Sequence, residues 1–319
     1  MSEDSTIRLN GCPNVAGIDG GASKTVALIA DANGRILGEG RAGPSNYHNI
    51  GVQAATLAIK TALRRARLDA GMTEKPDVAV VALAGIDSEH DMITASHFVK
   101  NSKIAQTSIV VHDSVAAIYA ATKGKPGIVV NSGTGSFAAG INRKGAYARA
   151  GGWGYIAGDE GSAYDIGLNA IKMAFRSFDG REKSTKVTEI VKRRFRVKEV
   201  DELVTQIYNT GLTVEQIAAV APSVIRSTGK DMISRRIVNE AGTQLGELVC
   251  TVALRLRMTK QDFPVVAVGG NFRSGGYLLQ SLKLRIRQGC PNARVIQMHV
   301  EPAHGSLSIA LEAFKKRQG

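Results

Sequence analysis

The strongest constraint on the fold is a strand–glycine turn–strand unit that occurs twice in the chain. The first copy has its turn in residues 17–25 (GIDGGASKT), and the second has it in residues 131–136 (NSGTGS). Each turn follows one apolar, β-rich run and leads into another, and each second run ends in a further polar turn. A hairpin of the same design in both halves indicates two domains of one architecture.

The pattern around the first turn predicts the element order β-β-β-α-β-α-β. Three short strands fit between Val15 and about Gly40, and residues 52–70 carry apolar side chains at helical spacing. Residues 78–84 form a continuous apolar run typical of a buried strand. A helix around 90–101 then leads to residues 109–111, which we also expect to form a buried strand.

The second half repeats this order and adds a long helical stretch. Strands are predicted at 127–131, 136–141, 147–150, 265–268 and 294–299, and helices at 159–176, through most of 184–254 and at 305–316. We therefore expect an α/β chain with an N-terminal domain at 1–117, joined by the C-terminal helix at 306–319, and a C-terminal domain at 118–305. The two domains are expected to enclose a cleft.

Length and composition narrow the class of protein. The 319 residues, 44% of them hydrophobic, suffice for two cores. The polar N-terminus does not read as a signal peptide, and no apolar run approaches the roughly 20 residues that span a bilayer. Cys12, Cys250 and Cys290 are far apart in sequence and form no C-x-x-C pair, which argues against a metal cluster. We expect a cytoplasmic protein with buried free thiols.

The net charge of +13 is compatible with anionic ligands, with nucleic acid or with no special partner. The densest basic run, residues 192–198, lies where polar and apolar residues alternate as on a surface helix. We interpret the run as a solvated helix face, because no nucleic-acid motif accompanies it. The sequence therefore favours neither a nucleic-acid nor a membrane partner.

The first glycine turn has the chemistry of a phosphate-binding loop. Gly20 and Gly21 have no Cβ to keep an anion away from the backbone N–H groups. Ser23, Lys24 and Thr25 add two hydroxyls and one positive charge. Taken alone, such a turn is more often a plain β-hairpin.

The second turn makes phosphate binding the favoured interpretation over a plain β-hairpin, because Gly133, Thr134 and Gly135 repeat the same arrangement. Two such turns are suited to grip a polyphosphate from both sides. Neither turn matches a Walker A or a dinucleotide-binding loop, each of which leads into a helix. Asp19, at the end of the first strand, is a candidate Mg²⁺ ligand through water.

Asp113 follows the last predicted strand of the first half and precedes a helix at 114–121. Ligands of open α/β sheets bind at the carboxyl ends of strands. A carboxylate there is suited to accept the proton of a hydroxyl that attacks the γ-phosphate of a nucleotide. An aspartate before a helix also serves as its N-cap, and both roles stay open at this point.

Residues 151–163 (GGWGYIAGDEGSA) contain Trp153, the only tryptophan. A core role is awkward for a tryptophan among glycines, whereas a flat indole suits the C–H face of a sugar. Asp159 and Glu160 offer acceptors for sugar hydroxyls, although Asp159 also reads as the N-cap of the next helix. The sequence favours sugar recognition.

Two further segments allow two readings each. Asn46, in the polar loop 45–49, carries an amide suited to sugar hydroxyls but also fits an ordinary loop. Gly269, Gly270 and Asn271 follow a predicted strand. They fit either a close approach to the adenine–ribose end of ATP or a tight turn.

Together these motifs resemble the N-acetylglucosamine kinase branch of the sugar kinase/Hsp70/actin superfamily, which is grouped with the BadF/BadG/BcrA/BcrD ATPases. The resemblance runs almost end to end and is most specific in residues 151–163. It implies two ribonuclease-H-like (actin-like ATPase) domains, ATP and Mg²⁺ as cofactors, a small-molecule sugar as substrate and a homodimer. The cysteines of the family's iron–sulfur activators have no counterparts at the matching helix, which disfavours that branch.

By position, the resemblance implies that Asp113 is the base that activates the 6-hydroxyl of the sugar. It implies sugar contacts at Asn46, Gly152, Trp153 and Asp159, phosphate contacts at both glycine turns, and adenosine contacts at Gly269 and Gly270. We expect a kinase for N-acetylglucosamine, glucose or both. A broad-specificity hexokinase or glucosamine kinase, and a non-catalytic actin-like sugar-binding regulator, stay open as alternatives.

Overall fold

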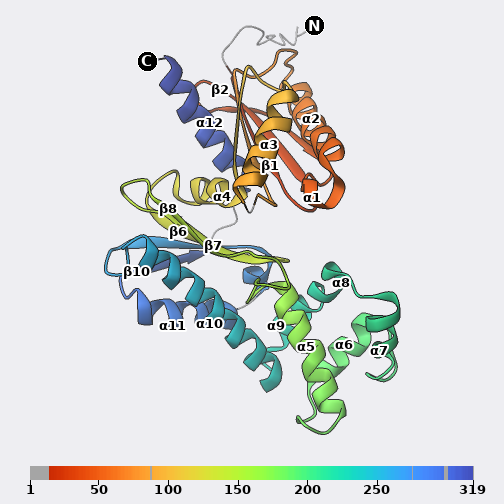
Figure 1. The fold of residues 1–319 in the computed structure, drawn as a ribbon. Helices are drawn as coiled ribbons and strands as arrows, with labels where there is room; N and C mark the ends of the chain where they lie inside the picture. Colours follow the sequence, from red (N-terminus) through yellow and green to blue (C-terminus); the bar gives the residue numbers. More distant parts are fainter. Residues whose placement is uncertain (1–13, 87, 275, 298–300, 319) are drawn as a thin grey trace, which may run out of the picture. The chain divides into compact units, whose positions relative to one another are not determined.

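The computed structural model describes residues 14–86, 88–274, 276–297 and 301–318, so Cys12 lies outside the described residues (Figure 1). The chain divides into two compact units, residues 1–125 with 300–319 and residues 126–299. The division falls later than the predicted boundary after residue 117, because that position lies inside a helix of the first unit. The expected cleft between the two units stays a prediction.

The first unit is built on a mixed five-stranded sheet in the order β3-β2-β1-β4-β5. Its strands are β1 (Asn14–Gly20), β2 (Thr25–Asp31), β3 (Ile36–Ala42), β4 (Val78–Leu83) and β5 (Thr107–His112). Strands β1, β2 and β3 are antiparallel neighbours, whereas β4 and β5 run parallel to β1. Short turns therefore join the first three strands, and helical crossovers lead to the last two.

Helices cover both faces of this sheet. They are α1 (Tyr47–Ile50), α2 (Val52–Asp69), α3 (Glu89–Asn101), α4 (Asp113–Thr122) and α12 (Ala303–Gln318). Ile18 and Ile29 pack with α2 and α3 on one face, and Val15 and Val80 pack with α12 on the other. Since successive side chains of a strand point to opposite faces, burial of both faces explains the continuous apolar runs of β1 and β4.

Strand β5 departs from the expectation of a buried strand before Asp113. All six of its residues are only half-buried. The reason is its place at the edge of the sheet, where β4 is its only strand neighbour among the described residues.

Helix α12 ends the chain but packs against β1, which begins the described part; Figure 1 shows it in dark blue beside the red and orange strands. The helix approaches unusually closely. A Cβ at Gly17 would overlap the backbone of Leu307, and one at Gly305 would overlap the Ala116 carbonyl in α4. The Ser306 hydroxyl donates a 3.0 Å hydrogen bond to the Ile18 carbonyl and so fixes the helix along the strand.

The second unit repeats the sheet, in the order β10-β9-β6-β7-β8. Its strands are β6 (Gly127–Ser132), β7 (Ser136–Ile141), β8 (Tyr147–Gly151), β9 (Phe263–Val268) and β10 (Ala293–Gln297). Strands β6, β7 and β8 are antiparallel, and β9 and β10 run parallel to β6. The two sheets thus share one topology, the ribonuclease-H-like arrangement, and the expected α/β fold class is confirmed.

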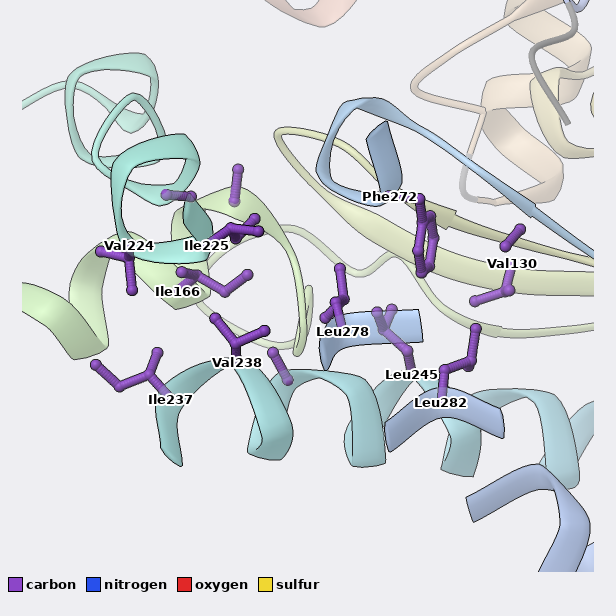
Figure 2. Packing of buried hydrophobic residues seen from close by; sticks show 14 of the residues in the cluster. Val130, Ile166, Val224, Ile225, Ile237, Val238, Leu245, Phe272, Leu278 and Leu282 are labelled. Atoms are coloured by element: carbon purple, nitrogen blue, oxygen red, sulfur yellow. The ribbon is translucent and has the colours of Figure 1, made fainter. Parts of the chain in front are cut away.

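Helices between β8 and β10 build most of the second core. They are α5 (Ala163–Phe178), α6 (Lys186–Phe195), α7 (Leu203–Thr205), the π-helix η1 (Gln206–Thr210), α8 (Val214–Ala218), α9 (Ala221–Ser227), α10 (Met232–Arg255), the 3₁₀-helix η2 (Gly270–Ser274) and α11 (Gly276–Gly289). Figure 2 shows Leu245 of α10 beside Leu278 and Leu282 of α11, in a core that also includes Val130 of β6. No helix in the described part of the chain is long and apolar enough to cross a membrane.

The glycine at position 17 provides a test of this packing. We expect Gly17→Ala to lower the free energy of unfolding by about 2 kcal/mol or more, because the new methyl group meets backbone atoms of α12 that cannot rotate away. Urea denaturation of the purified protein measures the change. Gly43→Ala is the matched control, since a Cβ there has no atom within 4 Å. Equal stabilities of the two variants would contradict the described contact.

Candidate active site

The first glycine turn lies at the carboxyl end of β1 and is held by backbone hydrogen bonds. The Gly21 amide donates to the Lys24 carbonyl at 2.9 Å, and the Ser45 amide donates to the Gly21 carbonyl at 3.0 Å. The side chains of Ser23 and Lys24 are exposed at the tip. The turn therefore presents one hydroxyl and one ammonium from a fixed backbone, as a phosphate loop requires.

Two residues of this turn serve the interior instead. Thr25 is fully buried, and its hydroxyl lies 2.7 Å from the Gly43 carbonyl and 2.9 Å from the Ser45 hydroxyl. This interior position argues against a phosphate contact by the Thr25 side chain, and the predicted contact stays untested. Gly20 lacks a side chain for reasons of packing, because a Cβ would overlap the Ser45 hydroxyl and come within 2.6 Å of Leu83.

Asp113 lies at the edge of the sheet where the parallel strands β1, β4 and β5 all end. His112 takes the N-cap position of α4, and Asp113 is the first helical residue. Its carboxylate accepts a 2.6 Å hydrogen bond from the Ser114 amide. Asp113 is thus half-buried at the helix N-terminus, where the helix dipole favours the ionised carboxylate.

Asp19 belongs to the same group of carboxyls. Its pKa is raised from the usual 3.8 to about 7, first by desolvation, then by the negative charges of Asp113 and Glu301, while Lys24 opposes the shift. Removal from water and like charges both disfavour a carboxylate. A cation at this position would reverse that balance.

The described residues can supply only part of a Mg²⁺ coordination shell. The described residues contain no cluster of three or more metal-ligating groups of His, Cys, Asp or Glu. Mg²⁺ commonly binds through one or two carboxylates and completes its shell with water and substrate phosphate oxygens. Asp19 is suited to such a site, because too little positive charge lies nearby to stabilise its ionised carboxylate and a bound cation would supply it.

Asn46 has a structural role that the sequence reading missed. It is the N-cap of α1, and its side-chain oxygen accepts a 3.1 Å hydrogen bond from the His48 amide. The same side chain lies against Gly85, where a Cβ would come within 2.8 Å of the amide oxygen. Its expected contact with sugar stays a prediction.

The second glycine turn joins β6 to β7 and is bound by two other segments of its unit. The buried Asn271 donates from its side-chain amide to the Ser132 hydroxyl at 2.9 Å and to the Gly133 carbonyl at 3.4 Å. The Ala163 amide, at the start of α5, donates to the same carbonyl at 2.8 Å. Thr134 is left exposed at the tip of a fixed turn.

Asp159 also contacts this turn. Its carboxylate accepts a 3.2 Å hydrogen bond from the Ser136 amide and lies where a Cβ of Gly135 would come within 2.9 Å. Helix α5 begins only at Ala163, with Ser162 as its N-cap, so the helix expected from 159 and the N-cap role of Asp159 are wrong. A left-handed backbone with φ of 62° at Asp159 prevents the helix from starting there.

The segment before Asp159 presents Trp153 to solvent. The indole is 60% exposed, so a core role is excluded, and the Arg149 guanidinium lies 5.6 Å from the centre of its ring. Arg149 also donates to the Gly152 carbonyl at 2.5 Å. Arg149 therefore fixes the glycine segment, while the indole stays accessible to solvent. Glu160 is exposed, and its carbonyl accepts a 2.7 Å hydrogen bond from the Ser136 hydroxyl.

One cavity collects residues predicted to bind the nucleotide. It has a volume of about 550 Å³ and is lined by Gly133, Thr134, Ala163, Glu215, Ala218, Ala219, Pro222, Ile225, Gly270, Asn271 and Arg273. A Cβ at Gly270 would point into open space, whereas one at Gly269 would overlap the Ser132 carbonyl. Gly269 is therefore required by packing at its φ of 109°, and Gly270 leaves room beside the cavity.

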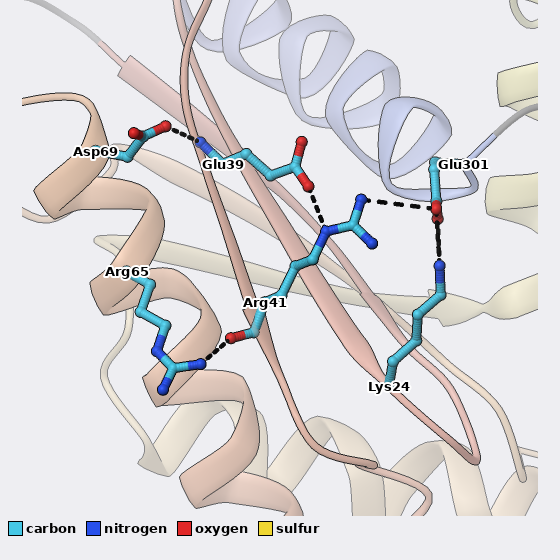
Figure 3. A network of polar contacts seen from close by, with 6 residues as sticks. All are labelled: Lys24, Glu39, Arg41, Arg65, Asp69 and Glu301. Carbon is cyan, nitrogen blue, oxygen red and sulfur yellow. Dashed lines mark hydrogen bonds and ion pairs between the residues drawn. The ribbon is translucent and has the colours of Figure 1, made fainter.

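Three residues near the cavity and the first glycine turn were not predicted from the sequence. Glu215 and Arg273 line the cavity from α8 and η2, in stretches without a motif. Glu301 precedes α12 and binds the Lys24 ammonium at 2.7 Å (Figure 3). No local pattern could have found Glu301, because 277 positions separate it from Lys24.

The raised pKa of Asp19 predicts a pH-dependent stability of the metal-free protein. A group whose folded-state pKa, about 7, exceeds its unfolded value binds more protons when folded, so stability falls as pH rises between the two values. We expect Asp19→Asn to remove this fall and to be the more stable form near neutral pH, by at most about 4 kcal/mol at about 1.4 kcal/mol per pKa unit.

Urea denaturation from about pH 4 to about pH 8 in the presence of a chelator measures the effect. Asp262→Asn, at an exposed carboxylate of the other unit, controls for the loss of one negative charge. Parallel curves for Asp19→Asn and the unmodified protein would contradict the assignment.

Comparison with known proteins matches nearly the whole chain. It is 32% identical over 298 residues to an N-acetylmuramic acid/N-acetylglucosamine kinase of Clostridium acetobutylicum, covering 93% of this chain and 97% of that protein. It is 29% identical to an N-acetyl-D-glucosamine kinase of Dictyostelium discoideum, over 94% and 98% of the two chains. A solved Chromobacterium violaceum protein, provisionally described as an N-acetylglucosamine kinase, superposes with a TM-score of 0.77 at 25% identity, over 94% and 99% of the chains.

The family model of the BadF/BadG/BcrA/BcrD ATPases matches residues 16–310, which include both glycine turns and both sheets except the first two residues of β1. The expected resemblance is confirmed, and the chain belongs to the BadF/BadG/BcrA/BcrD ATPase family.

Proposed function

We propose that this protein is an ATP- and Mg²⁺-dependent sugar kinase that phosphorylates the 6-hydroxyl of N-acetylglucosamine or a closely related hexose. The observation that carries the proposal is the cavity of the second unit. Residues from separate segments, Thr134 on the turn and Gly270 and Asn271 after β9, line one space of about 550 Å³ beside a fixed glycine turn. That space is of the size of small-molecule sites. The named activities of the two relatives support the same reading.

In the second unit, the cavity would take the adenosine, and the Thr134 turn would bind phosphate oxygens through its backbone N–H groups and hydroxyl. In the first unit, Ser23 and the Lys24 ammonium would bind the terminal phosphates. Mg²⁺, held by Asp19 through water, would neutralise charge on the transferred phosphoryl group. The Thr25 hydroxyl would support the first turn from within, through its hydrogen bond to the Gly43 carbonyl.

Asp113 would act as the general base. Its half-buried carboxylate would accept the proton of the sugar 6-hydroxyl as the hydroxyl oxygen attacks the γ-phosphorus. The bond from the γ-phosphorus to the bridging oxygen breaks, and the products are ADP and the sugar 6-phosphate.

Sugar contacts are proposed for Asn46, Gly152, Trp153, Asp159 and Glu160. The exposed indole of Trp153 supports this assignment, because its face is available for a sugar ring. The Asp159 carboxylate can accept more than one hydrogen bond, so its bond to the Ser136 amide leaves acceptor capacity for a hydroxyl.

The names of two relatives point to a 2-acetamido sugar as substrate, and a broad-specificity hexokinase or a glucosamine kinase is the alternative. A coupled assay of ADP release with N-acetylglucosamine, N-acetylmuramic acid, glucosamine and glucose decides between them. We expect the highest kcat/KM for an acetamido sugar. Similar values for all four would favour the broad-specificity enzyme, and no sugar-stimulated ADP would favour a non-catalytic regulator.

We also propose that the protein acts in the cytoplasm as a homodimer. ATP, the proposed phosphate donor, is a cytoplasmic metabolite, and members of the resembled family commonly dimerise. Light scattering of the purified protein tests the assembly, since one chain has a mass of 33.8 kDa. A mass equal to that of one chain would contradict the dimer.

Asp113→Asn keeps the shape of the side chain but removes its basicity. We expect kcat to fall by roughly 10²–10⁴-fold, the usual contribution of a general base, while the thermal unfolding midpoint stays close to that of the unmodified enzyme. Asp262→Asn, at an exposed carboxylate, should retain full activity. Near-normal turnover of Asp113→Asn would exclude Asp113 as the base.

Gly270→Leu tests the nucleotide cavity. The new side chain would enter the space beside the turn, so we expect the Kd for ATP to rise about tenfold, a cost of about 1.4 kcal/mol, with little change in stability. Isothermal titration calorimetry measures the affinity. Gly229→Leu is the matched control, because a Cβ there also meets open space but lies outside the cavity. Unchanged ATP affinity in Gly270→Leu would place the nucleotide elsewhere.

A further inference from the structure

The Lys24 side chain, exposed at the tip of the first glycine turn, is bound by a carboxylate from the other end of the chain. Both oxygens of Glu301 accept hydrogen bonds from the Lys24 ammonium, at 2.7 and 3.0 Å (Figure 3). Glu301 lies just before α12, the helix that packs closely against β1. The ion pair thus joins the turn to an element whose position is already fixed.

Glu301 is itself part of a larger polar network. The Arg41 guanidinium, from β3, lies 3.9 Å from a Glu301 oxygen and donates to the Glu39 carboxylate at 2.6 Å. Figure 3 shows these side chains converging, with Arg65 of α2 bound to the Arg41 carbonyl at 2.6 Å. Two cations therefore share the Glu301 carboxylate, and both are anchored to the sheet.

The ion pair between Lys24 and Glu301 contributes little to the stability of the fold. The Lys24 and Glu301 side chains are 47% and 37% exposed, and ion pairs at that exposure are worth at most about 1 kcal/mol. A free lysine side chain samples many rotamers, whereas two hydrogen bonds to one carboxylate select a single position for the ammonium. The pair is thus better suited to placing the ammonium than to holding the fold.

We propose that Glu301 is a positioning residue, which holds the Lys24 ammonium over the first glycine turn before a nucleotide phosphate arrives. This inference rests on the proposed kinase function. A phosphate at the turn would then meet a cation whose side chain has already lost its rotational freedom. A lysine ammonium has three N–H donors, so Lys24 can donate to the phosphate from this position while Glu301 and the neighbouring Arg41 stay in place.

If Glu301 competes with phosphate instead of positioning Lys24, a different kinetic result is expected. If Glu301 merely competed with phosphate for Lys24, its neutralisation would lower the KM for ATP and leave kcat unchanged. Positioning predicts that Glu301→Gln lowers kcat/KM for ATP by about tenfold and leaves the KM for sugar unchanged. Glu39→Gln is the matched control, because Glu39 binds Arg41 in the same network, whereas the hydrogen bonds of Lys24 go to Glu301.

A measurement without nucleotide tests the contact itself. Competitive labelling with acetic anhydride, read by mass spectrometry, reports how available the Lys24 amine is. An ammonium held by two charge-assisted hydrogen bonds must leave its carboxylate before it reacts. We expect Glu301→Gln to raise Lys24 labelling about threefold or more and Glu39→Gln to leave it unchanged. Equal labelling in both variants would overturn the proposal.

A double variant shows whether Glu301 acts through Lys24. On a Lys24→Met background, Glu301→Gln should cause no further loss of activity. A further loss, or an unmodified kcat/KM in the single variant, would overturn the proposal. Glu301→Asp, which keeps the charge on a shorter side chain, should lie between the extremes even if Glu301→Gln folds poorly. If the unmodified protein releases no ADP with any sugar, the kinase function fails, while the labelling still decides whether Glu301 holds Lys24.

Discussion

The close packing of α12 on β1 is the contact on which the candidate phosphate turn of the first unit depends. It requires glycine at 17 and is fixed along the strand by the bond from Ser306 to the Ile18 carbonyl, while Gly305 lets the same helix approach α4 closely. Because β1 leads directly into the glycine turn, the contact sets the distance between the turn and the residues that precede α12. In this arrangement Glu301, just before α12, binds the Lys24 ammonium.

The glycines of the two turns and of the segment after β9 illustrate how one residue type serves two purposes. Gly20 and Gly269 lack side chains because neighbouring protein atoms occupy the space. Gly133 and Gly270 border the cavity, and a Cβ at either would meet no atom closer than 3.8 Å. Only the second pair leaves room for a ligand. Sequence alone cannot separate the pairs, since the distinction lies in atoms brought there by the fold.

The sequence predicted those parts of the fold that depend on local residue patterns. Alternation, apolar runs and turn residues placed the strands and both glycine turns, and their repetition predicted two sheets of one topology. Its error at Asp159, the predicted helix start, has a tertiary cause, because Asp159 adopts a left-handed backbone while its carboxylate binds the second turn. The inward turn of the Thr25 hydroxyl to the Gly43 carbonyl is likewise invisible to the sequence. Glu301 was missed for the same reason, because its partner is distant in sequence.

The charges around the first turn bear on the phosphate and metal contacts proposed there. Burial first, and then the negative charges of Asp113 and Glu301, raise the pKa of Asp19 to about 7, so this group of carboxyls resists a further negative charge. A nucleotide phosphate would add several. Lys24 offsets part of this repulsion, and a divalent cation at Asp19 would favour its ionised form and offset more. Because Asp113 lies at the same edge of the sheet, the proposed transfer of the sugar proton to its carboxylate would take place beside these cations.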